Sequence, residues 1–430
     1  MSRTVITWLL IALLLRLVVG LAQDPLLPYS SETGGDSGWY LENGYKLVSG
    51  ADVSQLAPPP LYLIFIGLPQ LVLSPDAAVI VIRILQALAS VATCYCVYRI
   101  ARNIGGERAG MIALVLMVLS PVFILETAQI TTETLYLLWL GLAFVAYLNA
   151  QARRERSYWL LIVAGVCFGL ATLTRAALLL FPLGLVVHLL LIYRPALALR
   201  RSAVLLVVYA LVISTWTIYN LARWERFIIA GEGFASMIYI GAAGWESPQE
   251  VDSNLEQDAP SVASESRQDQ YIDGAATVIG RDVGGYLGRR ISELANAYLQ
   301  PHGTLFFPGE SLRELAVRWL TQERSLDGLV ALIQGDAFFP KMALYILHYG
   351  SIVVGLLGMW QTRRSWRVTL PLIGFVAYVT LLHLALFALP RYIFPTTIVW
   401  YSFAAVWLAS LSGVKSIIST QPVLAKDGMR

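Results

Sequence analysis

The chain has 430 residues, of which 57% are hydrophobic and only 14% are charged, and its mean hydropathy is +0.64. Soluble domains carry roughly 25% charged and about 45–50% apolar residues. The composition therefore excludes an ordinary soluble protein and indicates an all-α, polytopic membrane protein. The formal net charge of +3 gives no reason to expect a nucleic-acid partner.

The first apolar segment runs from Val5 to Ala22 and follows Arg3. This arrangement is similar to a signal peptide, but Arg16 interrupts the apolar run, which is unusual for such a segment. We interpret it as an uncleaved first membrane span. With either interpretation, the chain from Gln23 onward is expected outside the cytoplasm.

A polar stretch from Ser31 to Tyr62 follows, between two very apolar segments. Its acid Asp36 is predicted to lie at the membrane surface, either accepting a proton from a nucleophile or holding a divalent cation. The alternative is a solvated acid among turn-forming glycines. The apolar stretch Leu61–Leu73 is shorter than the ~20 residues that a span needs. We expect it to form a surface-lying or half-inserted helix.

Nine further segments are predicted to cross the membrane, which with the first makes about ten spans. Their approximate ranges are 77–100, 109–126, 133–150, 158–172, 175–193, 202–222, 342–360, 367–387 and 392–412. With the N-terminus inside, the basic clusters around Arg99, Arg153, Arg194 and Arg363 all fall on the cytoplasmic side, as the positive-inside rule requires.

One long external loop, from Arg223 to Pro340, contains 17 of the 28 acids. Its middle, Glu246 to Asp273, is rich in polar residues and is predicted to be flexible. Tyr286 to Leu294 is expected to form an interfacial amphipathic helix. The chain is thus divided into a transmembrane module (1–222, with the external loop 23–76), the long loop (223–340), C-terminal helices (341–414) and a cytoplasmic tail (415–430).

Ionisable residues at membrane depth are costly and are candidates for function. Glu126 and Glu133 flank a short connection on the same side as the polar stretch. Glu133 precedes an apolar helix, so a capping role is the alternative for it. Glu126 needs a partner, and Arg16, Arg83 and Lys46 are the candidates.

Three arginines are predicted near the outer ends of spans. Arg83 shares a helix face with Gln86 and suits a phosphate, with snorkelling to the head groups as the alternative. Arg175 tops a tight hairpin, where snorkelling is the favoured interpretation. Arg391 and Tyr392 open the last span and either clamp a lipid phosphate or anchor the helix at head-group level.

The order of these motifs resembles a known family. They are Pro-Pro-Leu-Tyr (59–62), Arg83-x-x-Gln86, Ser120-Pro121, Thr132-Glu133, Leu173-Thr174-Arg175 and Arg391-Tyr392-x-x-Pro395. The set resembles the GT-C fold glycosyltransferases of the protein mannosyltransferase and aminoarabinose transferase type, glycosyltransferase family 39. The resemblance is best over residues 1–240, recurs over about 286–305, and returns at 390–395.

The resemblance implies transfer of a sugar from a polyprenyl-phosphate donor to a lipid, glycan or protein acceptor on the outer face. It assigns Asp36 as general base, Glu133 as second acid, and Arg83, Arg391 and Tyr392 to the donor phosphate. Supporting roles are expected for Tyr40, Gln86, Glu126 and Arg175. In this family a second acid often follows the loop acid, but here Ser37 occupies that place. This weakens the case for a two-acid metal site, for which Glu32 or Glu126 would be the substitute.

The competing class is a transporter or flippase of a lipid-linked saccharide. Such a protein would place its charges nearer the membrane midplane, often with broken helices. Here the candidates cluster at the outer ends of the spans, beside a long external loop, which favours chemistry at the surface. Short loops and this architecture point to a bacterial inner membrane.

Overall fold

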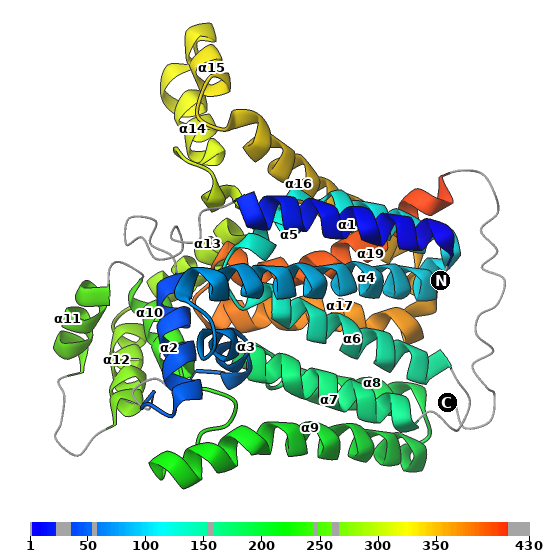
Figure 1. Ribbon diagram of the computed structural model, residues 1–430. Helices are drawn as coiled ribbons and strands as arrows, with labels where there is room; N and C mark the ends of the chain where they lie inside the picture. Colours follow the sequence, from blue (N-terminus) through cyan, green and yellow to red (C-terminus); the bar gives the residue numbers. More distant parts are fainter. Residues whose placement is uncertain are drawn as a thin grey trace.

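The computed structural model describes residues 2–22, 36–53, 58–152, 158–244, 248–259 and 266–411. The regular secondary structure in these ranges is helical, which confirms the expected all-α class. In Figure 1 the long helices run across the view, and helices α2 and α10 to α13 lie together at their left-hand ends. We call this end of the bundle the α2 end. The expected tail at 415–430 and Glu32 lie outside the described residues.

Seven described segments are long and apolar enough to cross a membrane. They are α1 (Arg3–Ala22), α4 (Pro75–Leu119), α6 (Glu133–Ala152), α9 (Pro195–Trp224), α16 (Phe338–Gln361), Arg363–Ala385 with α17 (Trp366–Ala385), and Pro390–Ser410 with α19 (Thr397–Ser410). The count is below the expected ten for two reasons. The segment α4 contains two of the expected spans, joined by a reversal of the chain at Gly106. Two others are shorter apolar segments, α7 (Tyr158–Thr174) and Ala176–Ile192, which ends in α8 (Phe181–Ile192).

The chain of α4 reverses at Gly106, whose φ of 84° and ψ of −178° are not helical. Glycine tolerates a positive φ because it has no Cβ. On either side of the reversal, the Tyr98 hydroxyl donates to Glu107 Oε1 at 2.6 Å. Farther from the turn, the Arg16 guanidinium bonds to both halves of α4, so the two halves lie side by side.

Arg16 is fully buried in α1, and its hydrogen bonds within the described residues go to hydroxyl, carbonyl and thiol groups. Its guanidinium donates to Ser90 Oγ at 2.7 Å, to the Met117 carbonyl at 3.1 Å and to the Ala12 carbonyl at 3.2 Å. A buried cation is tolerated when its donors are satisfied in this way. Arg16 therefore fastens α1 to α4, and the expectation that it could pair with Glu126 is wrong.

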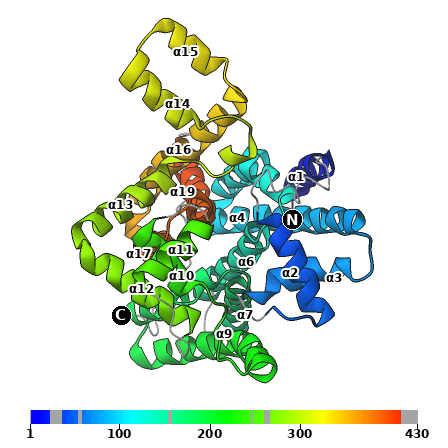
Figure 2. The same ribbon diagram turned by 90° about the vertical axis from the view of Figure 1, so that its left-hand side faces the viewer.

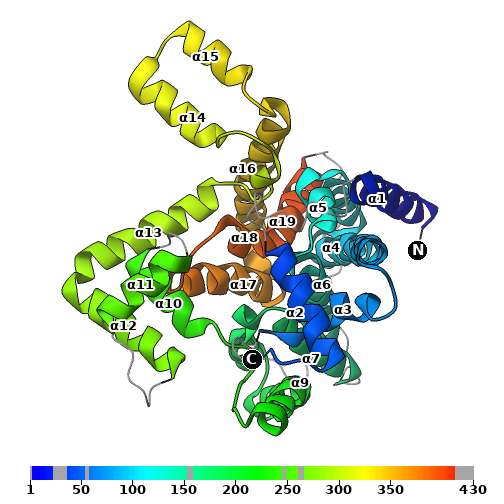
Figure 3. The same cartoon turned by 60° about the vertical axis from the view of Figure 1, so that its left-hand side comes forward.

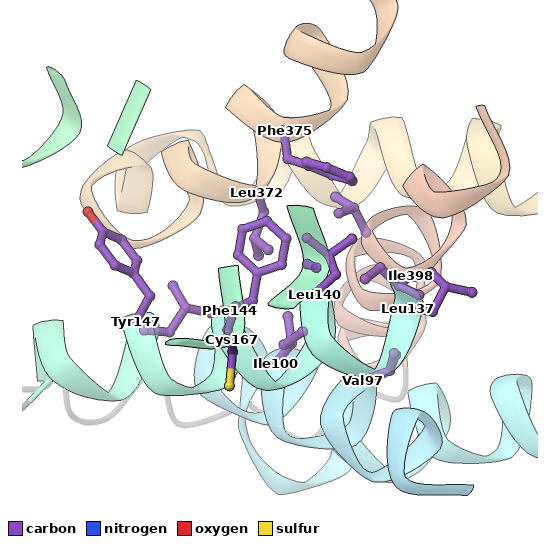
Figure 4. Packing of buried hydrophobic residues seen from close by; sticks show 14 of the residues in the cluster. Val97, Ile100, Leu137, Leu140, Phe144, Tyr147, Cys167, Leu372, Phe375 and Ile398 are labelled. Atoms are coloured by element: carbon purple, nitrogen blue, oxygen red, sulfur yellow. The ribbon is translucent and has the colours of Figure 1, made fainter. Parts of the chain in front are cut away.

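The bundle core is built around edge-to-face aromatic rings. Phe144 of α6 lies 5.5 Å from Phe375 of α17, and Phe181 of α8 lies 5.4 Å from Phe375. Such pairs stabilise a core beyond the burial of their area. Figure 4 shows Phe144 and Phe375 among buried aliphatic side chains of neighbouring helices. This core links helices from both halves of the sequence.

The long loop is largely helical where the structure describes it. Its helices are α10 (Phe234–Ala243), α11 (Pro248–Asp258), α12 (Arg267–Arg281) and α13 (Val283–Leu299). Flexibility was expected for 246–273 and stays a prediction; in its described parts the chain is helical, and α11 buries Val251 and Leu255 in a cluster with Tyr239. These few apolar residues suffice because they share one helix face. The predicted helix at 286–294 is confirmed as part of α13.

Helix α2 (Ser37–Ser49) begins directly after Asp36 and packs on the short helix α3 (Pro60–Gln70). The expected helix over 61–73 is thus confirmed as a short element. The two helices approach closely at Gly44 and Gly67. A Cβ added at Gly67 would lie 2.3 Å from the carbonyl oxygen of Gly44.

We expect Gly67→Ala to separate α2 from α3 and to displace Asp36. Overpacking of this kind costs about 1–3 kcal/mol, so the unfolding temperature in detergent should fall by several degrees. Gly374→Ala, in α17, is the matched control, because nothing lies within 4 Å of a Cβ at Gly374. Equal unfolding temperatures for the two variants would contradict the close packing.

Candidate active site

Two acid–arginine pairs lie at the α2 end of the bundle. Asp36, before α2, pairs with Arg391 of α18 (Pro390–Ile393), 355 residues away in the sequence. Glu133, the first residue of α6, pairs with Arg175 at 2.5 Å. The side chains of the first pair are 44% and 33% exposed, and those of the second are 3% and 13% exposed. The first pair is therefore accessible to a substrate, whereas the second is nearly buried.

Tyr392 joins the two pairs. Its ring centroid lies 5.2 Å from the guanidinium carbon of Arg175 and 5.2 Å from that of Arg391. Cations at this distance are attracted to the electron-rich ring face. The structure thus brings together five of the residues that the sequence singled out, although they come from four separate segments of the chain.

Tyr40 lies one turn into α2, where four charged groups act on it: Asp36, Glu133, Arg175 and Arg391. Desolvation raises the pKa of its hydroxyl to about 12, and the negative charge of Glu133 adds to the effect. The group therefore stays protonated at neutral pH. It can donate a hydrogen bond to an anion in this cluster, but it cannot serve as the base.

A second polar contact, between Glu126 and His302, lies beside the two ion pairs. Glu126, in the short 3₁₀ helix η3 (Glu126–Ala128), contacts His302 Nε2 at 2.7 Å and accepts a hydrogen bond from Thr131. Of the partners considered from the sequence, Arg16 contacts other groups and Lys46 pairs with Glu42. No sequence motif pointed to His302, which is the single histidine of the long loop.

Arg83 and Gln86 are both buried and contact the segment 127–129. Arg83 Nε donates to the Ala128 carbonyl at 3.0 Å. The Gln86 side-chain amide donates to the Gln129 carbonyl at 2.7 Å, and its oxygen accepts from Tyr62 at 2.8 Å. The shared helix face is therefore confirmed. These contacts position the segment between Glu126 and Glu133, and the expected contact of Arg83 with a phosphate stays a prediction.

A cavity lies next to the ion pairs and the Glu126–His302 contact, between the start of α16 and the start of α19. Apolar side chains make up much of its wall, and Ser120, His348 and Tyr401 add polar groups. The hydroxyls of Ser120 and Tyr401 are 2.9 Å apart. His302 and Pro390 also line the cavity, so it adjoins both the Glu126–His302 contact and the residue next to Arg391.

The described residues do not fit a divalent cation. No group of three or more His, Cys, Asp or Glu side chains that could hold a metal ion occurs among them. The carboxylate of Asp36, the candidate ligand, is paired with Arg391. A cation-binding carboxylate prefers oxygen-rich surroundings to a guanidinium partner. We therefore derive no step through a metal.

The fold is similar to that of known membrane glycosyltransferases. The apo form of the Archaeoglobus fulgidus oligosaccharyltransferase matches with a TM-score of 0.54 and 13% identity. The archaeal oligosaccharyltransferase AglB from Archaeoglobus fulgidus, in complex with an inhibitory peptide and a dolichol-phosphate, matches with 0.52 and 13%. Each match covers 95% of this chain but only 50% of the other. The chain thus spans about half the length of these proteins, and the likeness supports the expected GT-C fold.

A third solved structure, ArnT from Cupriavidus metallidurans bound to undecaprenyl phosphate, matches with a TM-score of 0.41 and 16% identity. The match covers 94% of this chain and 78% of that one, and at this TM-score no conclusion is drawn from it. Among curated proteins, none matches the sequence.

Residues 58–219 match the family described as dolichyl-phosphate-mannose-protein mannosyltransferase. This confirms the expected resemblance to glycosyltransferase family 39 over that segment. The matched segment contains Arg83, Gln86, Glu126, Glu133 and Arg175. Asp36, Tyr40, Arg391 and Tyr392 lie outside it, so their roles depend on the geometry of the site.

The different burial of the two ion pairs predicts different effects on stability. Glu133→Ala leaves Arg175 buried without its partner, which costs about 3–5 kcal/mol. Asp36→Ala breaks a half-exposed pair, worth about 0–1 kcal/mol. Thermal unfolding in detergent should therefore show a large loss for Glu133→Ala and a small one for Asp36→Ala. Equal losses would mean that the two pairs are not distinguished by burial.

Proposed function

We propose that this protein is an integral membrane glycosyltransferase. It transfers a sugar from a polyprenyl-phosphate donor to a hydroxyl or amine of a lipid, glycan or protein acceptor. The observation that carries the proposal is the convergence of Asp36, Glu133, Arg175 and Arg391 around Tyr392 at one end of an apolar helix bundle. The family match over 58–219 and the similar solved folds support it.

Asp36 acts as the general base. In the reaction, the acceptor oxygen or nitrogen forms a bond to the anomeric carbon. The bond between that carbon and the phosphate oxygen breaks, and its electron pair leaves with the polyprenyl phosphate. The acceptor proton goes to the Asp36 carboxylate. Asp36 suits this role better than Glu133 because its side chain is 44% exposed, whereas that of Glu133 is 3% exposed and held by Arg175.

Arg175 and Arg391 stabilise the leaving group. A phosphate gains negative charge as the glycosidic bond breaks, and a preorganised guanidinium lowers the energy of that charge. Arg391 pairs with Asp36 when no donor is bound. A donor phosphate competes for the same guanidinium, so donor binding loosens Asp36 from Arg391 and frees the carboxylate to accept a proton. Glu133 keeps Arg175 in place, and the Tyr40 hydroxyl donates a hydrogen bond to the donor phosphate.

The cavity beside α16 and α19 has space for little more than a water molecule, so only the donor carbons next to the phosphate contact its wall, and the rest of the isoprenoid chain lies in the bilayer. The cavity wall includes Leu344, Ile352, Phe394 and Trp400, which suit a hydrocarbon chain. The cavity adjoins Arg391 through Pro390, so donor carbons in contact with its wall place the phosphate near the arginine. Arg83 remains the predicted additional phosphate residue.

The α2 end lies on the outer face of the membrane in this proposal, as the distribution of basic residues predicts. The host membrane is the inner membrane of a bacterium. The transmembrane module 1–222 carries the catalytic loop 23–76, the long loop 223–340 forms the acceptor side, and 341–414 completes the bundle.

We expect Asp36→Asn to reduce turnover by about 10²–10⁴-fold, the usual contribution of a general base. The variant should bind the donor more tightly than the wild type, because Arg391 no longer has a carboxylate partner. Turnover is followed by mass spectrometry as loss of sugar from a polyprenyl-phosphate sugar panel, with membrane extract as the acceptor source. Donor affinity is measured with the same carriers.

Asp76→Asn is the matched control, because Asp76 is an exposed acid in the first turn of α4. It should leave turnover and donor affinity unchanged. Full turnover by Asp36→Asn would exclude Asp36 as the base. If the wild-type protein left every carrier intact but moved it across a vesicle membrane, the protein would be a transporter.

A further inference from the structure

A helical hairpin projects from the bundle and has no role in the site described above. It consists of α14 (Leu312–Arg318), the π-helical turn η6 (Trp319–Glu323) and α15 (Leu326–Ile333). We call these residues, 312–333, the arm. Its helices pack on each other and on the start of α16. Figures 2 and 3 show the arm extending well beyond the outline of the other helices.

The arm exposes large apolar side chains in a row. On α15, Leu326, Val330 and Ile333 share one helix face at the i, i+4, i+7 spacing. Leu326 is 80% exposed, and Leu320 on the other limb is 53% exposed. Apolar groups clustered in this way on an outer loop indicate a surface that contacts something other than water.

The position of the arm indicates that the contact is lipid. The arm leaves the bundle at the N-terminal end of α16, a candidate membrane span. Along α16 the outward-facing residues Ile346, Val353 and Trp360 are exposed, as in a helix that faces lipid. Phe339, at the junction, is 74% exposed and connects this surface to the arm. The apolar surface of the arm therefore continues the membrane-facing surface of the bundle.

The direction of the arm agrees with this. In Figure 1 it projects upward, away from the long helices, near their left-hand ends. Figure 2, which looks along those helices from the α2 end, shows it directed sideways from the bundle. An element that leaves a membrane protein sideways at the end of its spans lies over the surrounding bilayer. Arg324 is exposed at the turn of the arm and suits a phosphate head group, whereas Arg318 is paired with Glu310.

The root of the arm is fixed. Lys341, buried in the first turn of α16, donates hydrogen bonds to the carbonyls of Pro308, Gly309 and Glu310, at 2.6, 3.2 and 2.9 Å. Ser311 lies 3.3 Å from the hydroxyl of Tyr345, also on α16. The chain is thus held to α16 just before the arm begins, and it enters α16 just after the arm ends. These contacts fix the position of the arm along the direction of the membrane spans.

We propose that the arm binds the surface of the lipid bilayer at the α2 end, with Leu326, Val330 and Ile333 inserted at the boundary between head groups and acyl chains. This is the arrangement of an interfacial amphipathic helix. The proposal concerns the lipid contact alone. It does not depend on the sugar-transfer reaction.

Spin labels test the proposal on the full-length protein in nanodiscs of phosphatidylethanolamine and phosphatidylglycerol. Labels are attached at Leu326→Cys, Val330→Cys and Ile333→Cys. The matched controls are Asp327→Cys and Ala331→Cys, at exposed positions that share another face of the same limb. The native Cys94, Cys96 and Cys167 are buried, so the unaltered protein gives the background labelling.

We expect the three apolar positions to collide more often with oxygen, which dissolves in lipid, than with a water-soluble nickel chelate. The two control positions should show the opposite preference. Preference for the chelate at all five positions would place the arm in water and overturn the proposal. Protection of the three apolar positions from both reagents would overturn it as well, because the surface would then be covered by protein, either a partner or a second copy.

Discussion

Charged groups inside an apolar helix bundle persist only when they are paired or when their hydrogen bonds are satisfied, and this constraint organises the end of the molecule that carries the candidate site. The buried pair Glu133–Arg175 fixes the start of α6 against the turn after α7. Arg175 in turn contacts the ring of Tyr392, next to Arg391. The more exposed pair Asp36–Arg391 lies beside this contact. It joins the residue before α2 to α18.

The same constraint separates structural charges from those that can react. The donors of Arg16 are taken up by a hydroxyl and by backbone carbonyls, and Arg83 bonds to the segment before Glu133. Arg16 therefore holds α1 to α4, and Arg83 positions the segment before Glu133 in addition to its predicted contact with a phosphate. Asp36 and Arg391 are held by each other and remain accessible, so a phosphate and an acceptor can exchange with that contact. A site of this kind can bind charged substrates without first exposing buried ions.

Much of this could be predicted from the sequence, and the limits have physical causes. Apolar runs predicted the long helices, and the order of motifs predicted Asp36, Glu133, Arg175 and Arg391 as members of one site. The pairing of these residues could not be predicted, since a contact across 355 residues leaves no local pattern. His302 was missed for the same reason. The middle of the long loop, 246–273, was predicted to be flexible because its apolar residues are few, although Val251 and Leu255 share a face and pack α11 against neighbouring helices.

The central claim is that Asp36 and Arg391 act as one unit in sugar transfer, and a double-mutant cycle on turnover tests it most directly. Rates are compared for the wild type, Asp36→Asn, Arg391→Gln and the double variant. Residues that act as a unit give strongly non-additive losses. We predict that the double variant is no slower than the slower single variant. Losses that multiply would show that the two residues act independently and would contradict the account.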